Sequence, residues 1–591
     1  MCLLISMQRI PEQYSIPAAL HHYIVKTHRL FVGARMLRRL RTCCDNPRKA
    51  QEDVLLQIIN RNKNTEYGRL FRLGDIKSLE DLRTKHPVTD YSRYKTFADR
   101  IARGEKNVLT TEQVTRLTLT SGTTGEGKMF PQDRYYLEKM MMFVEAIQHE
   151  MFPELQPMQS KLKIHCNIQD VKSECGLPIT AASAVEDLML RHMVIYSTPP
   201  AGFMIWTSKE AMYVHLLFAL RDKNLGSIYT NFSSLFLDTI KYLETNWKTL
   251  VEDLARGTLN PALELSSDVR NSLSKALGSG DPQRAMEVQR ECQKGFDGIV
   301  KRLWPHMNFI AAIDNVGLRH ILQRSIAKGV EMYSPMYACS EALLGLNLFP
   351  FGKGEEEYVL NVAENVFEFI PEDDMDKSNP QTLFVDEVEV GQNYELLVTQ
   401  KYGLCRYKFG DVIRVSGFYK NCPMIKFLYR KATLLNLVGE KVTQPMIQNS
   451  LKTVLNKWAD TVELSHYSVA ESVLLYDFFN KDKETKTTDL YYVFFLELKP
   501  KKDESLPKDL KQEKLAEKID EDILKYFDEA YRLSLRTQIF PSTVYFVKPG
   551  AFSKLQEFLL ANTTASRAQF KMPLKLRTPK MAEILLENIH Q

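Results

Sequence analysis

The chain has 591 residues, of which 44% are hydrophobic and 26% are charged, and this composition is typical of soluble globular proteins. Its 78 basic and 73 acidic residues nearly balance, so the charge gives no indication of a nucleic-acid partner. The length allows roughly three or four domains of about 150 residues, or one large α/β domain with a smaller partner.

Cysteine spacing and the opening segment bear on the compartment. The nine cysteines are spaced irregularly, without a C-x-x-C pair, which argues against a zinc site and a secreted disulfide framework. The segment MCLLISM lacks the length and basic flank of a signal peptide, and no run approaches the ~18 apolar residues of a membrane span. We therefore expect a cytoplasmic protein without a transmembrane segment. Residues 31–41 mix arginines with apolar side chains, which favours a helix packed on its domain and leaves peripheral membrane contact as the alternative.

The first predicted elements lie before residue 160. Residues 51–106 are expected to be helix and loop, with a turn at 65–68 and a capping signal at 87–91 before another helix. The run RLTLT, 116–120, predicts a short strand. After a glycine-rich loop, Pro131 is expected to open a helix, because proline suits a first helical turn.

Helical patterns dominate 180–330, and later segments are strand-like. The predicted helices include 209–224 and 236–257, followed by two more on either side of a turn near residue 279. The predicted strands that follow are 358–370, 381–390 and 394–400. Past about 430 the pattern changes to strand 491–500, helix 511–533, strand 542–549 and helix 578–589. We predict an α/β protein with a large mixed α/β N-terminal domain, 1–429, and a smaller α+β C-terminal domain, 430–591.

The stretch TLTSGTTGEGKMFP, 118–131, combines hydroxyls, glycines and one lysine. Gly122 to Lys128 matches the first seven positions of a Walker A loop, but Met129 stands where a Mg²⁺-binding Ser or Thr is required. Residues 128–130 also look extended, whereas a Walker A loop runs directly into a helix. A phosphate site is still expected, because glycine N–H groups can approach an anion and further donors are present. These donors are Thr120, Ser121, Thr123, Thr124 and Lys128. The alternative is a surface hairpin rich in turn residues.

Two further clusters carry carboxylates. The segment YACSEALLG, 337–345, contains Glu341 after a tyrosine and a serine, and YKFGD, 407–411, places Asp411 behind a glycine. Taken singly, Glu341 could begin a helix and Asp411 could cap a turn. The three segments together are more informative than any one of them.

In this order the segments resemble the adenylation motifs of the acyl-adenylate-forming superfamily, and specifically the auxin-responsive acyl-acid amido synthetases of plants, the Gretchen Hagen family. The flanking segments 97–110, 243–260 and 417–444 are similar to family segments as well. The resemblance implies that the large domain is an adenylation domain. It also implies a two-step reaction, in which a carboxylic acid and MgATP give an acyl-adenylate and pyrophosphate, and an amine such as an amino acid then gives an amide and AMP.

The resemblance implies roles for the matching residues. The loop residues Thr120, Ser121, Gly122, Thr123, Thr124 and Lys128 would hold the β- and γ-phosphates of ATP. Tyr337 would stack on adenine, and Ser340 would meet the α-phosphate. Glu341 would bind Mg²⁺, and Asp411 would accept the ribose hydroxyls.

Family members are expected to insert a lysine from a mobile C-terminal domain. Arg430 and Lys431 lie at the predicted boundary and are the candidates for hinge and nucleotide contact. The segment 569–573, QFKMP, is similar to the family's Q-Y-K-x-P, so Lys571 is the expected catalytic lysine beside the substrate carboxylate. A mobile point charge can neutralise the α-phosphate only when the domain closes.

The sequence departs from the family pattern in three places. Cys339 replaces the usual Ser, Lys408 replaces Arg, and Glu440-Lys441 stands for Asp-Lys. Lys408 cannot make the bidentate fork of arginine, and Cys339 is interpreted as a structural thiol because no activating His lies in the motif. The acid pocket is expected near 180–260. Two alternative functions are a pseudoenzyme that serves as a scaffold and an acyl-adenylate donor to a thiol such as coenzyme A.

Overall fold

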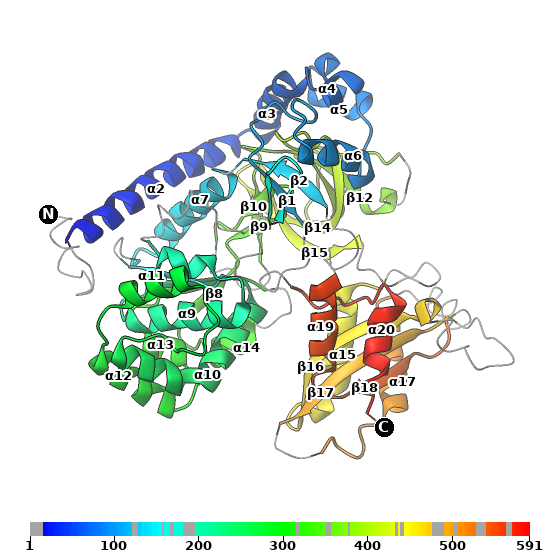
Figure 1. Ribbon diagram of the computed structural model, residues 1–591. Helices are drawn as coiled ribbons and strands as arrows, with labels where there is room; N and C mark the ends of the chain where they lie inside the picture. The colour runs from blue at the N-terminus through cyan, green and yellow to red at the C-terminus, as the bar shows by residue number, and fades with distance from the viewer. Residues whose placement is uncertain are drawn as a thin grey trace.

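The computed structural model describes residues 16–120, 128–133, 135–155, 159–165, 171–180, 195–314, 319–349, 356–375, 377, 379–431, 435, 437, 442–475, 490–501, 505–527, 539–562 and 570–590. In Figure 1 these residues form three lobes. The upper lobe holds the N-terminal helices and two sheets, a helical lobe lies below it on the left, and a C-terminal lobe lies on the right. The mixed α/β fold class that the sequence predicts is confirmed.

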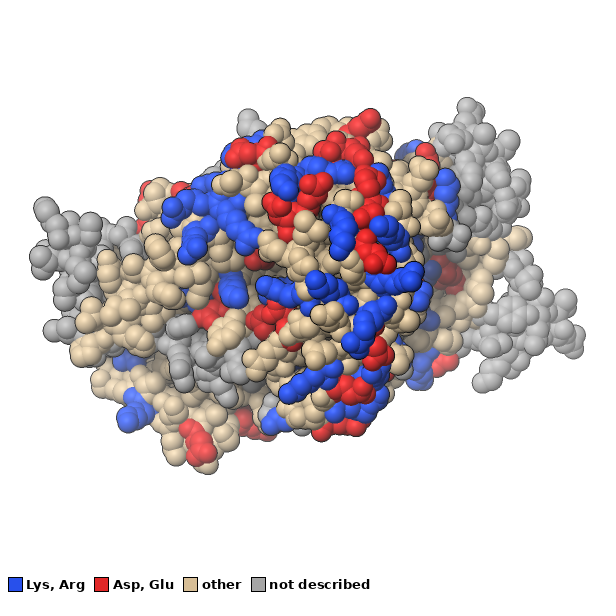
Figure 2. Space-filling model, turned by 90° about the horizontal axis from the view of Figure 1, so that it is seen from above, with Lys and Arg blue, Asp and Glu red and all other residues tan. Residues whose placement is uncertain are grey.

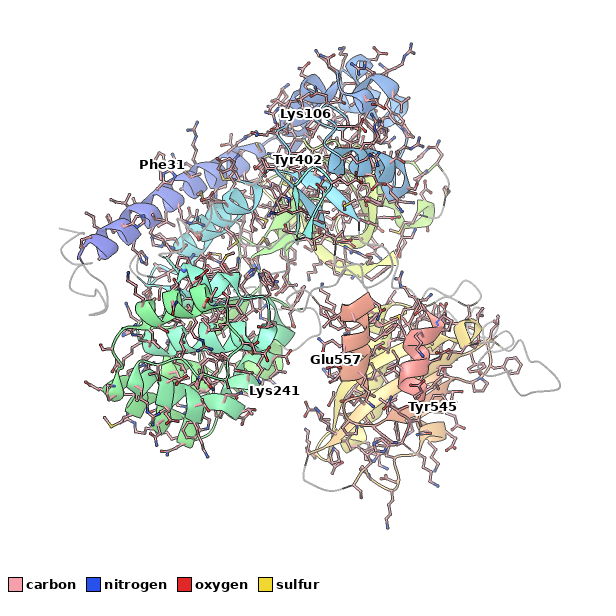
Figure 3. The ribbon with its side chains drawn as sticks, viewed as in Figure 1. Phe31, Lys106, Lys241, Tyr402, Tyr545 and Glu557 are labelled. Carbon is pink, nitrogen blue, oxygen red and sulfur yellow. The ribbon has the colours of Figure 1, made fainter. Side chains whose placement is uncertain are left out.

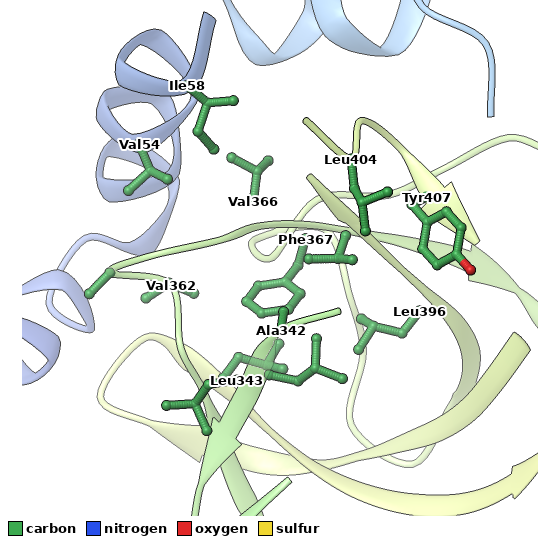
Figure 4. Packing of buried hydrophobic residues seen from close by; sticks show 14 of the residues in the cluster. Val54, Ile58, Ala342, Leu343, Val362, Val366, Phe367, Leu396, Leu404 and Tyr407 are labelled. Atoms are coloured by element: carbon green, nitrogen blue, oxygen red, sulfur yellow. The ribbon is translucent and has the colours of Figure 1, made fainter. Parts of the chain in front are cut away.

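A seven-stranded antiparallel sheet of order β12-β13-β14-β15-β11-β10-β9 forms the centre of the upper lobe. Its strands are β9 (Met336–Ala338), β10 (Leu343–Leu346), β11 (Tyr358–Leu360), β12 (Val366–Pro371), β13 (Asn393–Thr399), β14 (Tyr407–Tyr419) and β15 (Cys422–Arg430). Val54 and Ile58 of helix α3 (Pro47–Asn62) pack with Val366 and Phe367 in one hydrophobic core (Figure 4). The sheet therefore carries both of the predicted carboxylate motifs on one rigid support.

The other elements of the upper lobe surround this sheet. The helices are α2 (Ile16–Cys43), α4 (Glu66–Leu70), α5 (Leu79–Lys85), α6 (Tyr91–Ala102) and α7 (Tyr135–Met151), and a four-stranded sheet contains β1 (Arg116–Leu119), β2 (Met129–Gln132), β4 (Val171–Lys172) and β5 (Pro178–Thr180). Asp90 caps α6 by accepting from the Ser92 N–H, as the capping signal predicted. Thr65 does the same for α4, so the predicted turn is the start of a short helix.

Pro131 does not begin a helix, and that prediction was wrong. It lies in β2, where it pairs with Leu117 of β1. Because β2 is the edge strand of its sheet, the missing N–H of proline costs no ladder hydrogen bond. Helix α7 begins instead at Tyr135, whose N–H donates to the Asp133 carboxylate at 2.7 Å.

The predicted strand 381–390 is also absent, apart from one isolated bridge between Leu383 and Phe369. The apolar side chains that suggested a strand anchor a loop instead. Phe384 is fully buried, and the guanidinium carbons of Arg48 and Arg83 lie 4.5 and 4.8 Å from its ring centroid. A loop with a deeply inserted aromatic side chain has the same local pattern as a half-buried strand.

Helix α2 packs along α7, with Leu37 and Leu40 buried between them and Arg41 paired with Glu150. Residues 31–41 therefore belong to a helix packed on its domain, as the favoured interpretation had it. Phe31 lies on the outer side of the helix and is 65% exposed (Figure 3). Peripheral membrane contact through this face stays a prediction.

Among the described residues, no helix combines the length and apolarity required to cross a bilayer. On the face seen from above, basic and acidic side chains are interspersed (Figure 2).

The helical lobe is built on a parallel sheet of order β3-β6-β7-β8. The strands are β3 (Lys161–Lys163), β6 (Ser227–Phe232), β7 (Phe309–Ile313) and β8 (Glu331–Tyr333), and the helices are α9 (Ser208–Arg221), α10 (Ser233–Arg256), α11 (Ser267–Leu277), α12 (Pro282–Gln293), α13 (Ile299–Leu303) and α14 (Arg319–Arg324). Gly257 ends α10 with a φ of 70°, and a Cβ there would lie 2.4 Å from the Gly280 nitrogen. This close approach fixes the predicted turn near 279, after which Asp281 caps α12.

After residue 490 the C-terminal lobe has the predicted strand, helix and strand in order, followed by two helices where the sequence predicts one. Its elements are α15 (Gln444–Leu455), β16 (Val462–Glu471), β17 (Tyr492–Pro500), α17 (Gln512–Leu524), β18 (Thr543–Val547), α19 (Ala551–Asn562) and α20 (Pro579–Leu586). The central sheet of the upper lobe ends at Arg430, and the hydrophobic core of the C-terminal lobe starts at Leu435. The change in sequence pattern near 430 thus coincides with a change of core.

Replacing Phe384 tests whether it anchors its loop. Phe384→Ala should lower the free energy of unfolding by about 3 to 5 kcal/mol, because it removes a buried ring and leaves a cavity. Phe418→Ala is the control, since Phe418 is 41% exposed and should cost less than about 1 kcal/mol. Denaturant unfolding measures both, and equal losses in the two variants would contradict the anchoring role.

Candidate functional site

The Asp411 carboxylate is the centre of the site. Asp411 and Arg430 are cross-strand partners in β14 and β15, and the guanidinium donates to both carboxylate oxygens, at 2.5 and 3.0 Å. The Tyr337 hydroxyl of β9 donates to the same carboxylate at 2.6 Å. Asp411 is almost fully buried, whereas the Arg430 side chain is 47% exposed. The structure therefore brings the second and third predicted motifs and the boundary arginine into direct contact.

These contacts limit what Asp411 can still accept. A carboxylate offers about four lone-pair positions, and Arg430 and Tyr337 occupy three of them. Asp411 can accept both ribose hydroxyls only if Tyr337 or Arg430 gives up one of its hydrogen bonds to the carboxylate. The negative charge of Asp411 raises the pKa of Arg430, while burial and the same charge raise the pKa of Tyr337 well above its usual value, so both groups stay donors.

An aromatic surface adjoins this carboxylate. The Tyr337 ring centroid lies 5.9 Å from that of Tyr358 and 6.0 Å from that of Phe427. Phe427 is 46% exposed, so part of this surface is open to a ligand. The rings are tilted against one another by 40° and 46°, and an exposed aromatic face among them can stack on a planar base.

Glu341 lies in the turn between β9 and β10 and is 7% exposed. Burial raises its pKa, while the positive charges of Arg430 and Lys128 act in the opposite direction. Lys128, at the end of the glycine-rich loop, is thus close enough to interact electrostatically with Glu341 of the second motif. A buried carboxylate beside a phosphate loop fits Mg²⁺, which proteins bind through one or two carboxylates together with substrate phosphates.

The glycine-rich loop is closed at its base. The Thr120 N–H donates to the Lys128 carbonyl, and the Lys128 N–H donates to the Thr120 hydroxyl, both at 3.0 Å. Met129 follows in β2 and is held by the Tyr91 hydroxyl, which accepts from its N–H at 2.8 Å. The expected extended conformation at 128–130 is therefore confirmed, and the loop joins two strands of a hairpin. The predicted sites Ser121, Gly122, Thr123 and Thr124 lie outside the described residues.

The sequence analysis missed Gln132, which joins the hairpin to the second motif. Its amide donates to the Ser340 carbonyl at 2.7 Å. Its carbonyl accepts from Arg116 at 2.9 Å and from Thr118 at 2.7 Å, and all of these side chains are buried. The polar residues at alternate positions of β1 were the available signal, but Gln132 had been assigned to a helix.

Two departures from the family pattern are structurally explained. Burial and the charge of Glu341 raise the pKa of Cys339 well above its usual value, so the thiol stays protonated, in keeping with a structural role. Its Sγ lies 3.6 Å from the Ala342 carbonyl. Lys408 lies near Asp90. The hydrogen bond from Ser92 is the main cause that lowers the pKa of Asp90, and the positive charge of Lys408 adds to this effect. Glu440 and Lys441 lie outside the described residues.

Lys431 is not brought to Asp411. Its ammonium donates to the Met375 carbonyl at 2.8 Å and pairs with Glu395 at 3.3 Å. Strand β15 ends at Arg430, so Lys431 lies just beyond the sheet that directs Arg430 into the site. As a nucleotide contact Lys431 is thus disfavoured, while the hinge at 430–431 stays a prediction.

Lys571 reaches the site from the C-terminal lobe. Its ammonium lies 4.3 Å from the Phe232 ring centroid, at the end of β6. Although the side chain is exposed, surrounding protein and the positive charge of Arg430 lower its pKa to about 8, with Asp411 acting in the opposite direction. The segment is fastened to β16 nearby, since the Ser468 hydroxyl donates to the Pro573 carbonyl at 2.6 Å.

An electrostatic interaction also links the same two lobes. Burial is the main cause that lowers the pKa of His466 in β16, and the positive charge of Lys241 on α10 adds to the effect. Figure 3 labels Lys241 on α10 and Glu557 on α19, on either side of the gap between the lobes. Lys571 and Phe232 thus make their contact where the helical and C-terminal lobes approach one another.

Family models match most of the chain. The "GH3 family N-terminal domain" matches residues 36–324, the "GH3 family central domain" 358–430 and the "GH3 family C-terminal domain" 453–580.

Curated relatives span nearly the whole chain. Indole-3-acetic acid-amido synthetase GH3.17 of Arabidopsis thaliana is 28% identical and covers 94% of both chains. The 4-substituted benzoates-glutamate ligase GH3.12 of the same plant is 27% identical over 93% of this chain and 96% of its own. Among solved structures, the AtGH3.15 acyl acid amido synthetase in complex with 2,4-DB superposes with a TM-score of 0.80 at 24% identity, covering 95% of this chain and 96% of that one. This last likeness shows a common fold.

Gln132 offers a test of positioning. Gln132→Leu should weaken ATP binding about tenfold, because the turn that carries Ser340 and Glu341 loses its hydrogen bond to the hairpin. The matched control is Gln51→Leu, since Gln51 is equally buried but donates to the Asn365 carbonyl and not to the Ser340 carbonyl. Both variants should lose about 1 to 3 kcal/mol of unfolding free energy, but only the first should lose ATP affinity by calorimetry. Unchanged ATP affinity in Gln132→Leu would refute the positioning role.

Proposed function

The chain belongs to the GH3 family, and on that premise we propose that it activates a carboxylic acid with ATP and transfers the acyl group to an amine. The observation that carries the proposal is the convergence on one carboxylate. Tyr337 and Arg430 bind Asp411, and Lys571 of the C-terminal lobe is influenced by both charges of the Asp411–Arg430 pair. Three segments far apart in sequence thus meet where an adenylate would form.

In the first step, an oxygen of the acid attacks the α-phosphorus of ATP, and pyrophosphate leaves with the electron pair of the broken P–O bond. Asp411 orients the ribose, and the aromatic surface at Tyr337 receives the base. Lys571 places a positive charge beside the α-phosphate as negative charge develops there. The glycine-rich loop between Thr120 and Lys128 holds the departing phosphates.

In the second step, the amine nitrogen attacks the acyl carbon and AMP leaves. The amine loses a proton to solvent, so no covalent enzyme intermediate is required. Adenylation converts a poor leaving group into a good one, and the protein contributes positioning and charge stabilisation. The names of the relatives, an amido synthetase and a glutamate ligase, support an amino acid as the amine.

We propose Mg²⁺ as the metal partner of ATP, held by Glu341. Bound there, Mg²⁺ would neutralise phosphate charge.

We also propose that the protein is cytoplasmic. The free thiols of the described cysteines support a reducing, cytoplasmic compartment.

The acid is proposed to lie at the carboxyl ends of the parallel strands of the helical lobe. Phe232 ends β6 within contact of Lys571, and ligands of parallel sheets bind at this edge. This position agrees with the expected pocket in 180–260. Transfer to a thiol such as coenzyme A is the second candidate, but the relatives named above form amides.

Acid-dependent exchange of labelled pyrophosphate into ATP tests the first step. Over a panel of aromatic, fatty and amino acids, at least one acid should support exchange, and Lys571→Ala should lower the rate by about 10² to 10³-fold. Lys580→Ala is the control, since Lys580 pairs with Glu583 on the surface of α20. No exchange with any acid, together with measurable ATP binding, would favour the scaffold. Wild-type exchange in Lys571→Ala would reject the catalytic lysine.

The lowered pKa of Lys571 predicts a pH dependence. The ammonium is protonated below its pKa of about 8, so kcat/KM for exchange should be maximal below that pH and should fall as the pH rises through it. Lys571→Arg should retain its residual activity to higher pH, because arginine stays protonated. A wild-type profile that stays flat to pH 9.5 would contradict the assignment.

A further inference from the structure

One face of β3 carries a row of basic side chains. Leu162 and Ile164 belong to the core of the helical lobe, so the alternating residues Lys161, Lys163 and His165 face the other way. Their exposed fractions are 2%, 9% and 5%. The pattern K-L-K-I-H would suggest a solvated strand, but α7 and α2 cover this face.

Basic side chains outnumber acidic ones on this buried face. The titratable side chains considered are those of Lys26, Arg29, Lys161, Lys163, Glu138 and Glu145. Four are basic and two are carboxylates, and burial lowers the pKa of both Lys26 and Lys161. Glu145 accepts from Arg29 at 2.9 and 3.0 Å and from Lys161 at 2.8 Å, so one carboxylate already serves two basic side chains. An excess of buried positive charge is costly unless an anion compensates for it.

Lys163 is a basic residue of this face that has no acidic partner among the described residues. Within the ranges that the structure describes, its ammonium has no hydrogen-bond or ion-pair partner, and the charge that acts on it is the positive Arg29. Burial and Arg29 lower its pKa to about 8, so it is still largely protonated at neutral pH. Burial and the nearby positive charge of Lys163 lower the pKa of His165 well below its usual value, and its Nε2 is buried without a described partner.

The location connects this cluster to the reaction centre. Lys163 is at the carboxyl end of β3 and pairs with Tyr229 of β6. Phe232, which contacts Lys571, lies three residues farther along β6, or about 10 Å at the usual rise of a strand. A ligand that runs along the ends of these parallel strands can therefore reach Lys163 from the proposed site of acid activation.

We propose that Lys163 and His165 form a subsite for a second carboxylate on an organic substrate, remote from the carboxylate that is activated. The acid is the favoured carrier, because the subsite lies along the same strand ends. The claim that this carboxylate belongs to the acid that is activated rests on the proposed function, whereas the anion subsite itself does not.

The first experiment measures pyrophosphate exchange with α,ω-dicarboxylic acids of increasing length, each against the monocarboxylic acid of equal length. The wild type should favour the diacid of matching span at least tenfold in kcat/KM. Lys163→Gln should lose this preference while keeping its rate with monocarboxylic acids, and Lys163→Arg should restore part of it. Lys275→Gln, at an exposed lysine of α11, should leave the preference unchanged. Equal kcat/KM for diacid and monoacid in both wild type and Lys163→Gln overturns an acid-borne carboxylate.

A second arm identifies the carrier. With a fixed acid, the KM for amino acids is compared with that for amines that lack a carboxylate. If Lys163→Gln raises only the KM for amino acids and leaves exchange untouched, the subsite binds the carboxylate of the amine substrate. If Lys163→Gln changes neither half-reaction, the proposal is wrong.

Thermal unfolding without nucleotide separates this proposal from the proposed function. Millimolar diacid should raise the melting temperature of the wild type more than the matching monoacid does, and this difference should vanish in Lys163→Gln. Lys163→Gln should itself stay folded, because it removes a buried charge that lacks a partner. If diacids stabilise the protein but no acid supports exchange, the proposed function is wrong and the subsite is kept. If exchange occurs but neither diacid binding nor the KM for amino acids depends on Lys163, the subsite is wrong and the proposed function is kept.

Discussion

The bidentate pair between Asp411 and Arg430 is the interaction on which the site depends. It forms because β14 and β15 place the two residues directly opposite one another, and Tyr337 then joins from a more distant strand of the same sheet. Slipping β15 by one residue against β14 would turn Arg430 to the opposite face from Asp411. The long antiparallel hairpin is therefore as important to the chemistry as the motif residues it carries, and the same pair provides the field that Lys571 experiences.

The candidate residues could be named from the sequence because their motifs are local. Tyr337, Glu341 and Asp411 were proposed from short segments that together resemble a family, and Lys571 from a likeness near the C-terminus, and their roles stay predictions. The errors arose where one local pattern suits two structures. Pro131 is compatible with a first helical turn and with an edge strand, and the apolar residues of 381–390 suit a strand or an anchored loop. Only the pairing of Pro131 with β1, and the burial of Phe384 in the hydrophobic core, distinguish these possibilities.

Gln132 and Lys163 were missed for a different reason, because burial by distant elements gives them their importance. Nothing near Gln132 in sequence indicates that the Ser340 carbonyl will lie against it. Likewise, β3 has the alternation of an exposed strand until α2 and α7 cover its basic face. Such positions are determined by tertiary contacts across more than a hundred residues, as the Arg29–Glu145 pair illustrates.

Pro131 has a further consequence for how the protein behaves in solution. The hairpin that holds the predicted phosphate loop presents β2 as a free edge, and free edges can recruit strands from other molecules. Proline removes one donor from that edge and so makes it a poor template for intermolecular pairing. A residue that looks like a helix start in the sequence thus helps to keep this edge strand from becoming a point of aggregation.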